Sequence, residues 1–225
     1  MNSTLITPLS TPWLAAYLPS RQVEPAPLSP LSVDARWVPL RQAWLPGGNE
    51  QGFNPGWARI HWNDTELSYD VIMLGSRPAN RARRLNERTW ELGDVCEVFV
   101  QAVGAESYVE LHVTPENQRL QLLWPAGGLA RFRNNAAPLE DFAVAQTDWV
   151  KTGTHIGPGF WVAHAVIPLT CFGLTSLTPA SGFRTAVCRY DCDPCGTTFL
   201  STTAPLRAAD YHCTADWQYL VLRSP

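Results

Sequence analysis

The chain has 225 residues, 45% of them hydrophobic and 16% charged, so it is long and apolar enough to form a packed core. Its 17 basic and 20 acidic residues give a formal net charge of −3. This balance excludes general nucleic-acid binding, which depends on clustered positive charge. No apolar run approaches the ~20 residues of a transmembrane helix. Ten Trp residues are many for this length, and Trp serves both sandwich cores and ligand platforms.

The N-terminal stretch differs from the rest of the chain. Residues 1–35 contain six prolines, and proline removes backbone donors and fixes φ, so neither a helix nor a central strand is expected there. We predict a Pro-rich arm over residues 1–35 and one domain over residues 36–225. A signal peptide begins with a positively charged region, but no basic residue precedes Arg21 in this chain. The chain is therefore expected in the cytoplasm unless a signal has been removed.

Beyond the arm, short alternating or apolar runs are separated by turn residues, which predicts an antiparallel β-sandwich of jelly-roll type. No helical period persists, although Pro168 precedes a short helical turn expected at Leu169–Leu174. The expected strands are Gly56–Trp62, Glu66–Leu74, Asp94–Ala102, Ser107–Thr114, Arg119–Trp124, Phe160–Ile167, Phe183–Asp191 and Trp217–Arg223.

The best-defined element is a hairpin around Gly104–Ala105, whose alternation separates two faces. A tight turn places Glu97 opposite His112 and Phe99 opposite Glu110. The apolar face is expected in the core, and it carries Cys96, Val98, Val100, Val109, Leu111 and Val113. The other face is expected to be in contact with solvent and to meet any ligand, and it carries Val95, Glu97, Phe99, Gln101, Tyr108, Glu110 and His112.

The order of several motifs resembles that of the family 9 carbohydrate-binding modules of the DOMON-like superfamily. The segment Trp90–Phe99, WELGDVCEVF, is similar to the signature strand of that family. Upstream, Ala58–Leu67 is similar to its first hairpin, and downstream Gly159–Leu169 is similar to an aliphatic strand that ends in Ile-Pro. Segments 182–184 and 189–191 fit the next strand, and Trp217–Leu222 fits the closing one. The resemblance covers roughly residues 55–223.

The resemblance implies a module that binds a saccharide by clamping a sugar ring between two aromatic side chains. An aromatic face suits the apolar C–H face of a pyranose, and the sugar hydroxyls need polar partners. Position by position, Trp90 falls on the first clamp residue, Tyr211 on the second, and Glu97 on a rim carboxylate. His112 stands where the family pattern has Arg, and Glu110 where it has an amide. These five residues form the predicted ligand-binding site.

Two other functions fit the sequence. Glu97 and Glu110 lie on one face of neighbouring strands, so their carboxylates are expected about 5–8 Å apart. This approaches the ~5–5.5 Å of a retaining glycosidase pair, which makes a glycan hydrolase the alternative enzyme. No other feature supports that chemistry, so the chain is not expected to be an enzyme. A structural or interaction sandwich with a degenerate sugar site is the third interpretation.

Metal binding is a weaker expectation. Candidate zinc ligands by residue type are Cys192, Cys195, His212 and Cys213. A disulfide between two of these cysteines, or free thiols, fit the sequence as well. Cys96 and Cys171 are expected in the core. The resemblance also implies structural Ca²⁺, to which Asp64 and Glu66 offer loop carboxylates.

A run of arginines precedes the signature strand. It is interpreted as a solvated loop, with an anionic sugar as the alternative partner because arginine binds anions in a rigid fork. The run comprises Arg77, Arg81, Arg83, Arg84 and Arg88.

Overall fold

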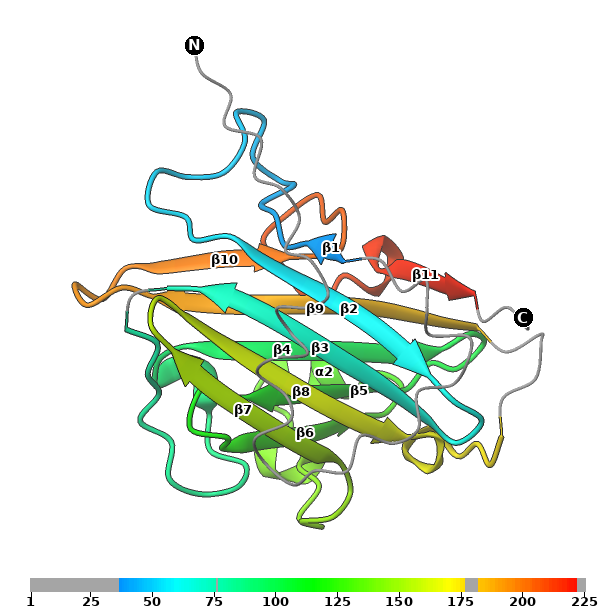
Figure 1. Cartoon of the computed structure of the whole chain (residues 1–225). Coiled ribbons are helices and arrows are strands. Elements are labelled where there is room, and N and C mark those ends of the chain that lie inside the picture. Colours follow the sequence, from blue (N-terminus) through cyan, green and yellow to red (C-terminus); the bar gives the residue numbers. More distant parts are fainter. Residues whose placement is uncertain (1–36, 76, 177–181, 222–225) are drawn as a thin grey trace.

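The computed structural model describes residues 37–75, 77–176 and 182–221, so the predicted arm lies outside the described residues. Two antiparallel sheets stack face to face, which confirms the predicted β-sandwich (Figure 1). The first sheet has the order β1 (Val38–Pro39), β2 (Gly56–Trp62), β3 (Glu66–Leu74), β8 (Phe160–Pro168) and β7 (Lys151–Gly157). The second has the order β10 (Thr198–Thr202), β9 (Gly182–Cys192), β4 (Val95–Ala102), β5 (Tyr108–Val113) and β6 (Arg119–Trp124), and β11 (Gln218–Val221) also pairs with β9.

All eight predicted strands are present, and β2, β3 and β6 have the predicted limits. Three strands were not predicted: β1, β7 and β10. The sequence of β7, KTGTHIG, contains two glycines and few apolar residues, so it has little strand propensity of its own. It is a strand because it pairs with β8 along seven residues at the edge of the first sheet.

The helical elements are short. The α-helix α2 (Gly128–Arg133) follows β6, and single 3₁₀ turns occur as η2 (Thr89–Glu91), η3 (Leu139–Phe142), η4 (Leu169–Phe172) and η5 (Thr214–Asp216). The turn η4 confirms the helical turn expected after Pro168. Over the described ranges, no helix has both the length and the apolar character needed to cross a bilayer.

The main core lies between the two sheets. It contains the whole predicted apolar face of the β4–β5 hairpin, and Cys96 and Cys171 are buried in it as expected. The hydroxyl groups of Tyr69 on β3 and Thr185 on β9 lie 3.1 Å apart and join the sheets inside this core. Because one face of each sheet is buried in this core, a one-residue shift of a strand would expose its apolar side chains, and the register is therefore fixed.

The hairpin register is also as predicted: Glu97 pairs with His112, and Phe99 pairs with Glu110. The expectation that this face is in contact with solvent is wrong. The long connection after β6 and the segment between β10 and β11 supply apolar side chains that cover it in a second hydrophobic cluster. Members from these two segments are Ala137, Leu139, Phe142, Ala204, Leu206, Tyr211 and Trp217.

Gly93 fixes the approach of the chain to β4. Its φ is +140°, and a Cβ atom there would lie 2.3 Å from the backbone oxygen of Ala79. Only glycine adopts this conformation at such a close approach without strain. The contact brings the loop that carries Asn80 against the start of β4, and it thereby places η2 beside the covered face of the second sheet.

Candidate ligand-binding pocket

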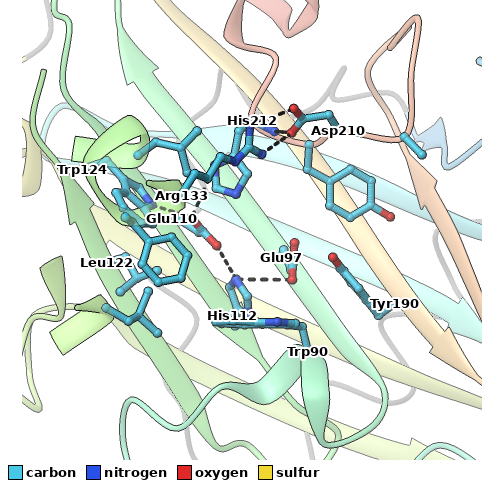
Figure 2. Close-up of a pocket in the computed structure, with 15 residues that line it drawn as sticks. Trp90, Glu97, Glu110, His112, Leu122, Trp124, Arg133, Tyr190, Asp210 and His212 are labelled. Atoms are coloured by element: carbon cyan, nitrogen blue, oxygen red, sulfur yellow. Dashed lines mark hydrogen bonds and ion pairs between the residues drawn. The ribbon is translucent and has the colours of Figure 1, made fainter. Parts of the chain in front are cut away.

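A pocket of about 280 Å³ opens in the cover of the second sheet, and all five predicted site residues line it (Figure 2). Its size is just below the roughly 300–1,000 Å³ typical of small-molecule sites, which suits a single ring. The lining side chains come from η2, β4, β5, β6, α2, η3, β9 and the segment before β11. They are Trp90, Glu97, Glu110, His112, Leu122, Trp124, Leu129, Phe132, Arg133, Leu139, Tyr190, Ala209, Asp210, Tyr211 and His212.

Two carboxylates and one imidazole form the floor of the pocket. His112 Nε2 lies 2.7 Å from Glu110 Oε1 and 3.3 Å from Glu97 Oε1. All three side chains are buried, and strand alternation on β4 and β5 turns them to the same face. Only the contact to Glu110 is a hydrogen bond. The imidazole therefore hydrogen-bonds to Glu110 and makes only a weaker ionic contact with Glu97.

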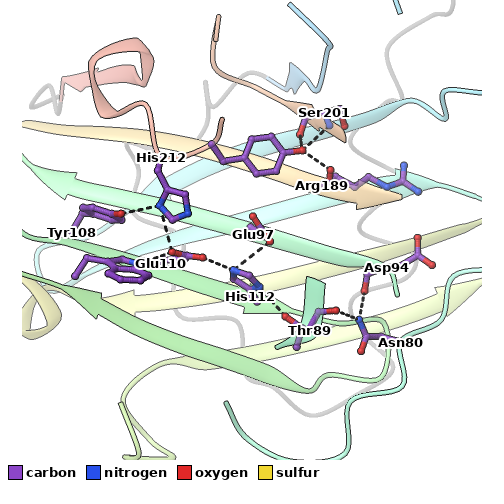
Figure 3. A network of polar contacts seen from close by, with 12 residues as sticks. Asn80, Thr89, Asp94, Glu97, Tyr108, Glu110, His112, Arg189, Ser201 and His212 are labelled. Carbon is purple, nitrogen blue, oxygen red and sulfur yellow. Dashed lines mark hydrogen bonds and ion pairs between the residues drawn. The ribbon is translucent and has the colours of Figure 1, made fainter. Parts of the chain in front are cut away.

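Surrounding groups hold His112 and Glu110 in place (Figure 3). His112 Nδ1 lies 2.8 Å from the Thr89 hydroxyl, and Asn80 Nδ2 donates to the backbone oxygen of Thr89 at 2.8 Å. The indole N–H of Trp124 donates to Glu110 Oε2. Both oxygens of Glu110 and both nitrogens of His112 thus have protein partners. These contacts fix the polar floor before any ligand arrives.

The two carboxyl groups respond differently to the same burial. Burial raises the pKa of Glu97, His112 opposes this rise and the negative charge of Glu110 adds to it, and the resulting pKa is about 8. Burial acts on Glu110 as well, but the hydrogen bond from His112 and the nearby histidines outweigh it and lower its pKa. Burial opposes protonation of His112, yet Glu97 and Glu110 together raise its pKa. The favoured state is a neutral Glu97 beside an ionised Glu110 and a protonated His112.

Trp90 lies on η2 and is half-buried, with one part of its indole on the pocket. Its ring contacts His112 edge-on, with centroids 5.6 Å apart. Figure 2 shows Trp90 and Tyr190 on the side of Glu97, and Trp124 on the side of Glu110. A ring bound above Glu97 would therefore meet aromatic surface and a carboxylate together.

Tyr211 lines the pocket but is tied into the protein. Its hydroxyl donates to the backbone oxygen of Arg189 at 2.7 Å and accepts from the backbone N–H of Ser201 at 2.8 Å. Its ring packs edge-on against Phe99 and Tyr190 in the second cluster. Tyr211 is thus in the predicted place, and its role as second clamp stays a prediction. Tyr190, which also lines the pocket, is half-buried, whereas Tyr211 is 5% exposed.

Several lining residues escaped sequence reasoning. Trp124 and Tyr190 belong to predicted strands, and the same alternation that selected Glu110 places them on this face. Strand alternation could therefore have predicted both residues in the site. Arg133 on α2 and Asp210 before β11 form an ion pair at the rim, with nitrogen–oxygen distances of 2.8 and 3.1 Å. They come from irregular segments, where no period predicts which side chains meet.

The predicted zinc ligands do not assemble. All six cysteines are free thiols, so no disulfide joins the candidates. Across residues 37–75, 77–176 and 182–221, the group whose ligand atoms lie close enough for a metal ion is Glu97, Glu110 and His112, within 4.8 Å of one another. His212 instead contacts the Tyr108 hydroxyl at 2.8 Å through Nδ1.

The loop proposed for Ca²⁺ is closed by its own hydrogen bonds. Asn63 Oδ1 accepts from the backbone N–H groups of Thr65 and Glu66, and Asn63 Nδ2 donates to the Glu66 carboxylate. Asp64 is exposed. These residues do not fit a site that needs six to eight converging oxygen ligands.

The arginine run is a solvated loop, as first interpreted. Its five arginines are exposed, and the pocket lining includes none of them. Arg84 pairs with Glu87 and Arg88 with Glu91 within the loop. An anionic sugar in this pocket would therefore find no help from the run.

Comparison with known proteins relates the chain to others by structure. No protein-family profile and no curated protein sequence matches it. A protein of Bacteroides uniformis to which carbohydrate binding is attributed superposes with a TM-score of 0.65 at 18% identity, over 83% of this chain and 85% of that one. A family 9 carbohydrate-binding module of Caldicellulosiruptor kristjanssonii in complex with cellotriose superposes with a TM-score of 0.58 at 9% identity, over 88% and 87% of the two chains.

A family 9 module of the same organism in complex with glucose gives a TM-score of 0.54 at 12% identity, over 84% of this chain and 82% of the other. These neighbours span nearly the whole sandwich, so the likeness concerns the complete domain. The fold of this chain is that of the family 9 carbohydrate-binding modules.

Proposed function

We propose that this chain is a non-catalytic carbohydrate-binding module that holds one sugar ring in the pocket beside Trp90. The observation that carries the proposal is Glu97. Its side chain is 4% exposed, lines the pocket and lies 3.3 Å from His112 Nε2, yet it accepts no hydrogen bond from any described residue. A largely buried carboxyl that accepts no hydrogen bond from the protein is costly, so a ligand that supplies donors is favoured there.

The walls suit a sugar as well as the floor does. A pyranose has an apolar face of C–H groups and a rim of hydroxyls, and both need matching surfaces when water leaves. Trp90 and Tyr190 offer aromatic surface, and Leu129 and Phe132 offer further apolar surface. Arg133 and Asp210 place donors and acceptors at the rim.

The structural neighbours support the same function. Two of them are family 9 modules seen with cellotriose and with glucose. The volume of about 280 Å³ fits a single ring better than a long chain, which favours recognition of a terminal residue or a monosaccharide.

The hydrolase alternative fits the contacts less well. Both oxygens of Glu110 are engaged, one by His112 and one by Trp124, and a nucleophile or base needs a free oxygen toward the substrate. A degenerate site is disfavoured because the Glu97 carboxyl lines the pocket without accepting a hydrogen bond from any described residue, and a merely structural pocket would pair or replace it.

The test is binding of the purified full chain to a glycan array, beside two variants. Trp90→Ala removes the aromatic wall. Tyr219→Ala is the matched control, because Tyr219 is 58% exposed on β11 and does not line the pocket. We expect the chain and the control to retain the same sugars, and Trp90→Ala to lose them.

Two outcomes contradict the proposal: no glycan retained by a protein that unfolds cooperatively, or equal retention by Trp90→Ala. Incubation of each retained glycan with the chain separates binding from hydrolysis. Release of shorter sugars that Glu110→Gln abolishes would replace the module with an enzyme.

A further inference from the structure

The rim of the pocket is balanced in charge. Arg133 and Asp210 pair through two contacts, and both side chains are about half exposed. They cancel one another and are screened by water, so they contribute little net field to the floor. Any imbalance in the pocket therefore comes from the buried groups beneath them.

The floor carries two carboxyl groups against one shared imidazole nitrogen. A single N–H at His112 Nε2 makes a full hydrogen bond to only one acceptor, and the 2.7 Å contact to Glu110 takes it. Glu97 is left at 3.3 Å. His212, the other imidazole nearby, lies 3.8 Å from Glu110 rather than against Glu97, and burial lowers its pKa, which disfavours a second positive charge there.

Glu97 consequently lacks a hydrogen-bond donor, and it shares its one counter-charge, His112, with Glu110. Neutral sugar hydroxyls supply donors but leave the buried charge unbalanced, whereas a cationic donor supplies both. The free protein relieves the imbalance by keeping a proton on Glu97, whose pKa burial raises to about 8. A ligand cation takes the place of that proton.

We propose that the preferred ligand is an amino sugar with a free ammonium group, which lies against the Glu97 carboxylate while the sugar ring packs on Trp90. This rests on the proposed saccharide function and names the class of sugar. An N-acetylated sugar lacks the charge and is discriminated against. A uronic acid brings a third carboxylate to a floor that already holds two, and is excluded.

The experiment measures dissociation constants by calorimetry at pH 6.5, in one series with EDTA and in a parallel series without it. The ligands share one ring: glucose, 2-amino-2-deoxyglucose, 6-amino-6-deoxyglucose and N-acetylglucosamine. We expect at least one of the amino sugars to bind about 10-fold more tightly than glucose, because a charged donor strengthens a hydrogen bond to a carboxylate. N-acetylglucosamine binds no better than glucose.

Glu97→Gln removes the charge at nearly constant shape, and we expect it to bring the affinities of glucose and the amino sugar within about 3-fold. Glu140→Gln is the matched control on η3, where the carboxylate is exposed and outside the pocket, and it keeps the preference.

The outcomes separate this inference from the proposed function. If glucose binds as tightly as both amino sugars, the preference for an ammonium group is refuted and the proposed saccharide site is not. A preference that survives in Glu97→Gln overturns the assignment to Glu97. If the sugars bind only in the absence of EDTA, a metal ion and not the ligand ammonium balances the charge of Glu97, and the ammonium proposal is refuted. If none of the four sugars binds and the array is also blank, the saccharide site itself is refuted.

Discussion

Replacing Glu97 by Gln should stabilise the protein increasingly as pH rises. The folded chain holds a proton on Glu97 up to a pKa of about 8, whereas the ordinary value is 4.5. Between these values folding takes up one proton, so the contribution of Glu97 to stability is full below pH 4.5 and is lost as pH rises through 8. Gln mimics the protonated form and has no such loss.

The size of the effect follows from the two pKa values. One pKa unit corresponds to about 1.4 kcal/mol, and the loss slows as pH nears the folded value. From pH 6 to pH 8 the free energy of unfolding of Glu97→Gln should therefore gain about 2 kcal/mol relative to the unaltered chain. Urea denaturation of both proteins at pH 6, 7 and 8 measures this gain.

Two further variants are compared in the same denaturation experiment. Glu140→Gln, on the exposed surface, should follow the unaltered chain at every pH. Glu110→Gln should be less stable by roughly 3–5 kcal/mol above pH 5, because an ionised Glu110 accepts from both His112 and Trp124 and its loss leaves a buried cation. Parallel curves for Glu97→Gln and the unaltered chain would refute the reasoning that burial holds a proton on Glu97.

Three further substitutions test the packing around the pocket. Tyr211→Phe should cost about 1–3 kcal/mol in thermal unfolding and leave the order of sugar preferences unchanged, because it removes a buried hydroxyl that bonds the backbones of Arg189 and Ser201; altered preferences would give Tyr211 a direct ligand role. Asn80→Ala should cost a similar amount and weaken sugar binding, since Asn80 supports η2; unchanged affinity would contradict that support. Arg133→Ala should change stability by less than about 1 kcal/mol, as expected for an exposed ion pair, and a larger loss would show that the rim is structural.

The β4–β5 hairpin was predictable because alternation has a single consistent solution there. One face of six apolar residues must be buried, so the pairing of Glu97 with His112 follows from the turn. Glu97, Glu110 and His112 consequently share one face, and Trp90 and Tyr211 join them in one pocket from segments outside the hairpin. Where local pattern and global burial agree, the sequence predicts geometry at the level of single pairs.

The cover of the pocket was not predictable in the same way. Leu129 and Phe132 lie in the six-residue helix α2, and Leu139 and Phe142 lie in the 3₁₀ turn η3 after Pro138. Elements this short present no period to recognise. The sequence therefore predicts that the polar face of the β4–β5 hairpin is in contact with solvent, although it is buried beneath these residues. The burial of Glu97, from which its raised pKa follows, depends on this cover, so the chemistry of the site emerges only from the tertiary structure.

A crystal structure of the chain with an amino sugar tests the central claim most directly. The account predicts the sugar ring against the indole of Trp90, with its ammonium within hydrogen-bond distance of a Glu97 oxygen and the His112–Glu110 contact retained. A sugar bound elsewhere on the surface, with the pocket beside Trp90 filled only by water, would contradict it.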